Sequence, residues 1–146
     1  MMRLNNYLFM SLTLSGLLFA ASCKKDSDIP DPYCEAGNEG NITLILQPEH
    51  HEDPITSLPN YLDSAFIKFN TNEYPGGDDP ALYDMVVVGT AGSNEVVVNN
   101  LSCGSYFIFM TGFDVSIAER VKGGIPFEVS YDDSLRTIKI PVTEDP

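Results

Sequence analysis

The chain has 146 residues, of which 43% are hydrophobic, and its 8 Lys and Arg residues against 21 Asp and Glu residues give a net charge of −13. Because phosphates repel so acidic a surface, we expect no nucleic-acid partner. The hydrophobic content suits a packed core, and the length allows one ordinary domain and not two.

Residues 1–22 predict a targeting segment. Arg3 gives a positive start, and an apolar run from Tyr7 to Ala21 follows, shorter than the ~20 residues that cross a bilayer. The small residues before Cys23 resemble the lipobox of bacterial lipoproteins, with Ala20 standing where Leu is commonest in that motif. The resemblance implies that Cys23 is acylated and becomes the mature amino terminus. Cleavage by the ordinary signal peptidase is the alternative.

Residues 23–33 predict a tether that joins the acylated cysteine to a domain at 34–146. The tether holds two lysines, three aspartates and two prolines and has no apolar periodicity. A charged run in this place resembles the surface-export signal of Bacteroidota lipoproteins, and a plain solvated linker is the alternative. We expect an outer-membrane lipoprotein, on the cell surface or in the periplasm, held to the membrane by its acyl chains.

The cysteine count fits this location. Acylation of Cys23 leaves Cys34 and Cys103 as a pair in an oxidising compartment. We therefore expect a disulfide between Cys34 and Cys103, with two separate buried thiols as the alternative.

Seven β-rich segments follow, with turn residues between them and no helical periodicity. They predict an all-β fold, a single seven-stranded antiparallel Greek-key β-sandwich. The composition of 89–94 predicts a hairpin between two of the strands, and 115–122 predicts a helical turn or an irregular crossing that Gly123 and Gly124 end. The expected strands are 41–47, 64–70, 83–88, 95–98, 106–113, 125–130 and 138–142.

The strand at 106–113 is apolar on both faces, which is typical of a central strand. We expect one face to fill the core and the other to need cover. That cover can come from the loop 48–63, from the segment 115–122, or from another protein. The two faces hold Tyr106, Ile108 and Met110, and Phe107, Phe109 and Phe113.

The turn that enters this strand carries Leu101, Gly104 and Tyr106 at the spacing L-x-x-G-x-Y. It resembles the turn of transthyretin-like (prealbumin-like, carboxypeptidase-regulatory) sandwiches, in which the glycine takes a positive φ and the tyrosine hydroxyl returns to the backbone. With other short motifs along the mature chain, such as 112–114 and 121–126, it resembles a group of short surface lipoproteins of the Bacteroidota. That resemblance implies a fold and a location, and it supplies no catalytic residue.

The loop expected at 48–63 contains both histidines of the protein, His50 and His51, next to Glu49, Glu52 and Asp53. Imidazole and carboxylate groups are ligands for zinc or copper. Adjacent residues of an extended chain point apart, so both histidines reach one ion only where the loop bends sharply. The alternative is a solvated acidic loop tip that serves as a contact surface.

We interpret the protein as a non-catalytic binding or interaction module of the cell envelope, whose protein or glycan partner meets the loops that carry His50 and His51. A metal-binding envelope protein that uses His50, His51 and Glu49 is the alternative. A hydrolase has least support, because the chain lacks a G-x-S-x-G motif and its two histidines are consecutive. No organic cofactor is expected.

Overall fold

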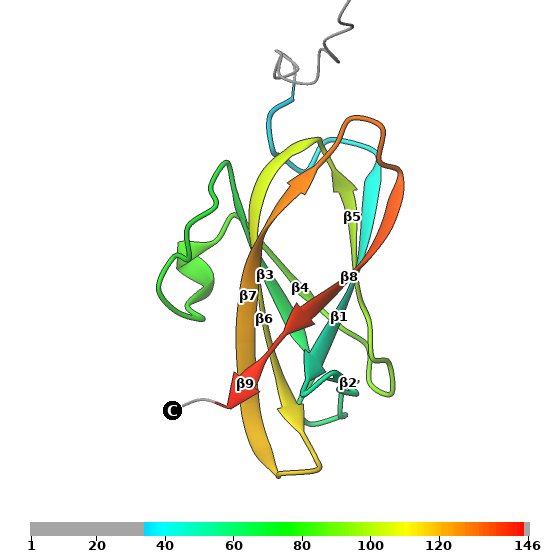
Figure 1. The fold of residues 1–146 in the computed structure, drawn as a ribbon, viewed down its shortest axis with the longest axis vertical. Helices are drawn as coiled ribbons and strands as arrows, with labels where there is room; N and C mark the ends of the chain where they lie inside the picture. The colour runs from blue at the N-terminus through cyan, green and yellow to red at the C-terminus, as the bar shows by residue number, and fades with distance from the viewer. Residues whose placement is uncertain (1–33, 145–146) are drawn as a thin grey trace, which may run out of the picture.

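The structure, a computed structural model, describes residues 34–144. The expected signal peptide 1–22, the acylation site Cys23, the tether 23–33 and the last two residues of the expected domain lie outside the described residues. Within 34–144 the fold is all-β, and two sheets face each other as a sandwich (Figure 1). One turn of 3-10 helix, η1 (Pro80–Leu82), lies outside the sheets.

The first sheet is built around β1 (Ile42–His50). One edge of β1 pairs antiparallel with β5 (Val96–Leu101) and, near its end, with β2 (Asp53–Pro54). The other edge pairs with β8 (Leu135–Pro141) in parallel. The parallel pair corrects the expectation of a wholly antiparallel sandwich.

The second sheet has the order β4-β3-β6-β7-β9. The long strand β6 lies in its middle, so the prediction of a central strand is confirmed. All seven expected segments overlap a strand of four residues or more, and the two-residue strands β2 and β9 were not predicted. The strands of this sheet are β3 (Ser64–Phe69), β4 (Met85–Val88), β6 (Gly104–Asp114), β7 (Glu119–Val129) and β9 (Thr143–Glu144).

The core lies between the sheets because each strand turns alternate side chains inward. Every second residue of β1, from Ile42 to His50, is buried, and Tyr106, Ile108 and Met110 of β6 face them with no exposed surface. A second cluster lies on the opposite face of β6, where Phe107 and Phe109 pack with aromatic partners. The second cluster is Phe66, Tyr83, Phe107 and Phe109.

The cover of Phe107 and Phe109 comes from the chain before β4, and the loop 48–63 covers Phe113, since the ring centroid of Tyr61 lies 5.2 Å from that of Phe113. The ring centroid of Tyr74 lies 5.2 Å from that of Phe109, and that of Tyr83 lies 6.2 Å from it. Segment 115–122 instead makes the turn between β6 and β7 and the first residues of β7. The chain itself therefore covers Phe107 and Phe109, which are 7% and 3% exposed.

Three further expectations about turns are wrong. The connection 89–94 joins β4 to β5, which lie in different sheets, so it crosses the sandwich and forms no hairpin. Gly123 and Gly124 lie inside β7, where a Cβ on Gly123 would overlap the carbonyl oxygen of Pro141 as the chain passes from β8 to β9. Pro48 does not end β1, and its carbonyl accepts a hydrogen bond of 3.0 Å from the Ile55 amide across the β1–β2 hairpin.

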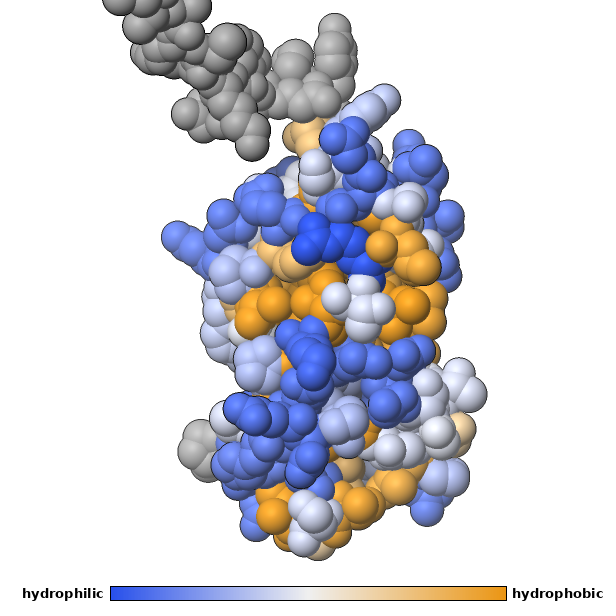
Figure 2. All heavy atoms as spheres, turned by 45° about the vertical axis from the view of Figure 1, so that its right-hand side comes forward, coloured by the Kyte–Doolittle hydropathy of each residue, from blue (hydrophilic) through white to orange (hydrophobic). Residues whose placement is uncertain are grey.

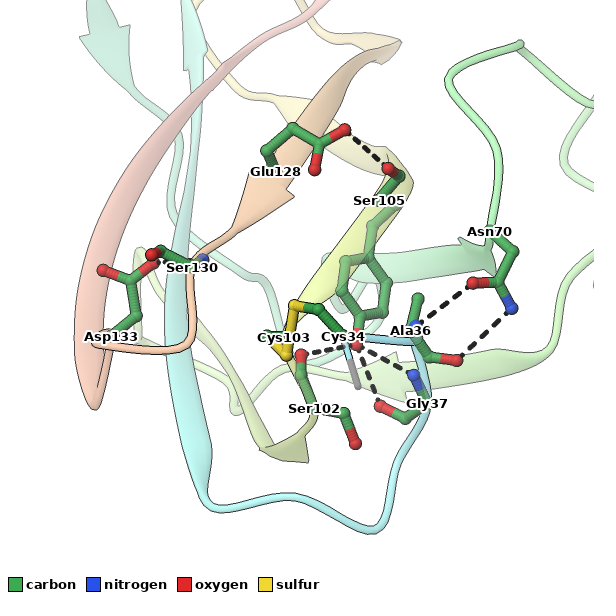
Figure 3. Close-up of a disulfide and its surroundings, with 11 residues drawn as sticks. Cys34, Ala36, Gly37, Asn70, Ser102, Cys103, Ser105, Glu128, Ser130 and Asp133 are labelled. Carbon is green, nitrogen blue, oxygen red and sulfur yellow. Dashed lines mark hydrogen bonds between the residues drawn. A yellow bond between two sulfur atoms is a disulfide. The ribbon is translucent and has the colours of Figure 1, made fainter. Parts of the chain in front are cut away.

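The end of the sandwich at which the described chain begins is held together by a disulfide and by hydrogen bonds between the residues around it (Figure 3). Cys34 and Cys103 form a disulfide that joins residues 69 positions apart. The buried Tyr106 hydroxyl lies 2.8 Å from the Ser102 carbonyl, to which it donates, and accepts from the Gly37 amide at 3.0 Å. Gly104 has a φ of +137°, and a Cβ there would overlap Ala36.

Candidate metal centre

His50 is the last residue of β1 and points into the molecule. The alternation of β1 puts it on the inward face, and only 3% of its surface is exposed. It therefore does not lie at the tip of a solvated loop, as expected from the sequence. The sequence does indicate this inward position, since every second residue of an extended strand lies on one face, here Ile42, Leu44, Leu46, Pro48 and His50. Ending the expected strand before Pro48 left His50 outside it.

Asp114 holds one nitrogen of the His50 ring. The Nδ1 atom of His50 lies 2.7 Å from Oδ2 of Asp114, the last residue of β6, and both side chains are buried. A second contact fixes the carboxylate, since the Ser116 amide donates to its Oδ1 at 2.7 Å. The bond between Asp114 and His50 was not predicted from the sequence.

These hydrogen bonds set the charge of the pair. The hydrogen bond from Ser116, followed by the one from His50, holds the pKa of Asp114 below its usual value. The bond to Asp114 raises the pKa of His50, whereas burial acts to lower it. An ionised Asp114 only accepts, so Nδ1 of His50 carries the donated proton. In neutral His50 the lone pair is then on Nε2.

The Nε2 atom of His50 is buried and has no hydrogen-bond partner in the described chain. Oε1 of Glu144, in β9, lies 3.4 Å from this nitrogen. The backbone amide of Glu144 itself, and then the neighbouring His50, hold the pKa of Glu144 below its usual value, so this group is ionised. In neutral His50 a lone pair on Nε2 therefore faces the Glu144 carboxylate, and in protonated His50 the two groups form an ion pair.

His51 comes close to His50 because the chain reverses sharply. His51 and Glu52 have φ values of +51° and +71°, the left-handed conformation that a two-residue hairpin turn of this kind requires. The ring centroids of His50 and His51 lie 4.1 Å apart. Asn and Gly are the usual residues of such a turn, so His51 adopts a conformation that costs free energy here.

Three side chains offer ligand atoms that all lie within 4.8 Å of one another: His50, His51 and Glu144. Within residues 34–144 this is the one group of three or more such residues that could hold a metal ion. Glu49, the expected carboxylate, is not part of it; its Oε1 lies 2.7 Å from Nζ of Lys139. The sequence offered no signal for Glu144, one acid among 21 and 94 positions from His50.

A hollow of about 280 Å³ opens on the side of His50 that faces Asp114, and Glu144 is not part of its wall. His50 and His51 form part of its wall, together with Asp53 and Asp114 and with apolar side chains from the β2 region and the β6–β7 turn. The apolar part of the wall is Ile55, Phe113, Val115 and Ile117.

Comparison with protein-family models, with curated proteins and with solved structures finds no match to the chain. None of the described residues forms a helix long and apolar enough to cross a membrane.

Proposed function

We propose that the domain is a non-catalytic binding module whose ligand is a divalent transition-metal ion, zinc or copper, held by His50, His51 and Glu144. The observation that carries the proposal is the buried Nε2 of His50, which has no hydrogen-bond partner in the described chain and faces a second imidazole and a carboxylate. Leaving a buried polar atom without a partner costs about 1–3 kcal/mol. An ion at this point would satisfy it.

The contacts around His50 are those of a metal ligand. A ligating histidine usually donates its other ring N–H to a carboxylate, which fixes the tautomer and aims the free nitrogen at the ion. Asp114 makes that contact from β6. Two imidazoles and one carboxylate suit zinc or copper better than the all-oxygen sites of calcium or magnesium.

The charge of the domain favours the same ligand. Four of the 21 acidic and three of the 8 basic residues lie outside 34–144, which leaves 17 acids against 5 bases in the described chain. A surface with this excess attracts cations.

The ligand atoms need only a small movement to bind one ion. Two atoms that both bind tetrahedral zinc at ~2.1 Å lie ~3.4 Å apart, so ligand atoms separated by up to 4.8 Å must approach by about 1.4 Å. His51 and Glu144 are exposed and free to rotate by this amount, whereas His50 is fixed by Asp114.

We further propose that the module works in the cell envelope, anchored through acylated Cys23, as an outer-membrane lipoprotein with a transthyretin-like Greek-key sandwich. The lipobox-like sequence supports the location. The positive φ of Gly104 and the hydroxyl contacts of Tyr106 support the fold type.

The test is metal analysis of the chain purified without a histidine tag. We expect one zinc or copper ion per chain, and a loss of affinity of about 100-fold or more in each of His50→Gln, His51→Asn and Glu144→Gln. His51→Asn is the sharpest of the three, because asparagine suits the left-handed turn and removes only the imidazole.

Glu52→Gln is the matched control, since it changes an acid of the same turn that belongs to no ligand group. It should bind metal as the parent chain does. Absence of stoichiometric metal, or equal affinity in His50→Gln, would refute the proposal.

A further inference from the structure

We infer that a second copy of this chain pairs with the free edge of β4, so that the second sheets of two copies join into one continuous sheet. The inference goes beyond the proposed function and uses none of the metal ligands. It comes from three features of β4: its unpaired backbone groups, its exposed apolar side chains, and the absence of charge along it.

β4 is an outer strand of the second sheet. It pairs with β3 on one side, and no strand of the described chain pairs with its other side. The Gly89 amide donates to the Asp63 carbonyl at 2.8 Å, two positions along from Val87 in the same register. Opposite residues of an antiparallel ladder alternate between hydrogen-bonded and non-hydrogen-bonded pairs. Val87 therefore bonds to β3, and the amide and carbonyl groups of Val86 and Val88 face the free edge.

These backbone groups match those of a second copy. Val86 and Val88 each offer one donor and one acceptor, at the two-residue spacing of an antiparallel ladder. In a two-fold pair centred on Val87, Val86 of each copy lies opposite Val88 of the other, and every one of these donors finds an acceptor. Any extended partner strand can pair with one such edge. A second copy satisfies two edges at once, with the closed two-fold symmetry that is commonest in homodimers.

The side chains of the same two residues are apolar and exposed. Val86 and Val88 expose 39% and 56% of their surface, and Val86 lies next to Phe66 of the outer cluster. In the two-fold pair each valine lies opposite a valine of the other copy, which removes apolar surface of both from water. Exposed apolar side chains alone do not identify the interface. They also reach the surface on the face drawn in Figure 2, where a band of hydrophilic side chains separates two groups of them.

β4 has no charged side chain and no proline. Asp84, the acid next to it, lies 3.0 Å from Lys68, so pairing brings no unpaired like charges together. The outer strand β8 of the first sheet holds Arg136 and Lys139, and charges of this kind block strand pairing. β5 is uncharged as well, but Val97 is its one exposed large apolar side chain. Among these edges β4 is therefore the one suited to pair with a copy of itself.

The test is the oligomeric state of the chain, measured by sedimentation equilibrium from micromolar to millimolar concentration in the presence of a metal chelator. We expect a weak, reversible dimer, because so short a ladder buries less than the standard interface of about 1,600 Å². We expect added salt to strengthen the dimer. The described part of each copy holds 17 acids against 5 bases, and salt screens the repulsion between copies without weakening an uncharged contact.

A charged variant locates the contact. Val88→Lys should weaken dimerisation about tenfold or more, since it places a charge opposite an apolar side chain. The change lowers the net negative charge, so a loss cannot come from greater repulsion between copies. Val115→Lys makes the same change in the β6–β7 turn, where Val115 is 64% exposed, and should leave the dimer intact.

Cysteine variants test the register. Val87→Cys places a thiol on the two-fold axis, where opposite Cα atoms of a non-hydrogen-bonded pair lie about 4.5 Å apart, within the range of a disulfide. Met85→Cys is the matched control on the same strand, because its two copies would lie about 14 Å apart. On oxidation we expect a disulfide-linked dimer, mapped by mass spectrometry to position 87, from the first variant and not from the second.

The outcomes leave the metal proposal aside, since zinc analysis tests it separately. A chain that stays monomeric at millimolar concentration, or a dimer that salt weakens, overturns the inference. So does a dimer that Val88→Lys leaves unchanged, or equal cross-linking of the two cysteine variants.

Discussion

The two ends of the sandwich differ in how completely the chain satisfies its own polar groups. At the end near Cys34, a disulfide closes the structure and the buried Tyr106 hydroxyl both donates and accepts hydrogen bonds. At the opposite end lie all three buried side-chain atoms of the described chain that have no hydrogen-bond partner, and they belong to His50 and Asp63. The buried side chains at the first end have hydrogen-bond partners within the chain, and those at the second end include groups whose partner can be a ligand.

Both ends are linked through one strand. β6 begins at Gly104 beside the disulfide and ends at Asp114 beside His50. Because strands are stiff over this length and β6 is paired on both sides, a rigid first end helps to hold Asp114 in place at the second. Stability is thus concentrated at one end and binding groups at the other, and the variants below test that division.

The largest effect is expected at the completed end. Replacing Cys34 and Cys103 together by alanine removes a cross-link across 69 residues, and the chain-entropy relation gives a loss of about 4 kcal/mol in the free energy of unfolding. Urea unfolding of parent and variant measures this loss. A loss below about 1 kcal/mol would show that the first end does not depend on its disulfide.

Much of this end was predictable because its determinants are local or periodic. The alternation of apolar residues predicted the inward faces of β1 and β6, and the two-faced pattern of β6 identified it as central. The pairing of Cys34 with Cys103 followed from the cysteine count, which left one partner for each.

The opposite end was less predictable because long-range register assembles it. Asp114 ends β6 and Glu144 ends the two-residue β9, and nothing in their neighbours along the chain ties either to His50. The amino-acid composition of a turn indicates that the chain reverses, but it does not indicate which sheet the next strand joins. Residues 89–94, which cross from β4 to β5 in the other sheet, therefore resembled a hairpin. The sharp turn at His51 and Glu52 also lacked the usual Asn-Gly signal.

The second-largest effect is expected from Asp114→Asn. Asparagine keeps the shape of the side chain, but its one carbonyl oxygen cannot serve both the Ser116 amide and Nδ1 of His50. Loss of such a contact behind a ligand typically lowers metal affinity 10- to 100-fold. Zinc titration of the variant measures the change. Asp84→Asn, which alters an acid that pairs with Lys68 far from the site, is the control and should bind zinc normally.

Asp63 is the other residue at this end whose buried side chain has no hydrogen-bond partner, and it predicts that the stability of the domain depends on pH. Its carboxylate has no exposed surface and no partner, and burial raises its pKa above the ordinary value of 3.8. The folded chain therefore binds this proton more tightly than the unfolded chain. The resulting stabilisation is complete below the unfolded pKa and is lost as the pH rises through the folded pKa.

Asp63→Asn should remove this dependence. Each tenfold strengthening of proton binding on folding contributes about 1.4 kcal/mol. We expect the parent chain to lose stability relative to the variant as the pH rises from 4 to 8, measured as the difference in urea midpoints. Parallel curves for the two chains would mean that Asp63 has a partner in solution.

The smallest effect is expected at the turn that carries His51. Glu52 has a φ of +71°, a conformation that costs a residue with a side chain about 1 kcal/mol and glycine almost nothing, so Glu52→Gly should stabilise the metal-free chain by about 0.5–1 kcal/mol. Urea unfolding measures the gain, and zinc titration should show unchanged affinity because Glu52 is not a ligand. A gain in stability accompanied by loss of zinc would mean that the strained turn itself sets the position of His51, and that this end of the sandwich maintains the strain in order to bind.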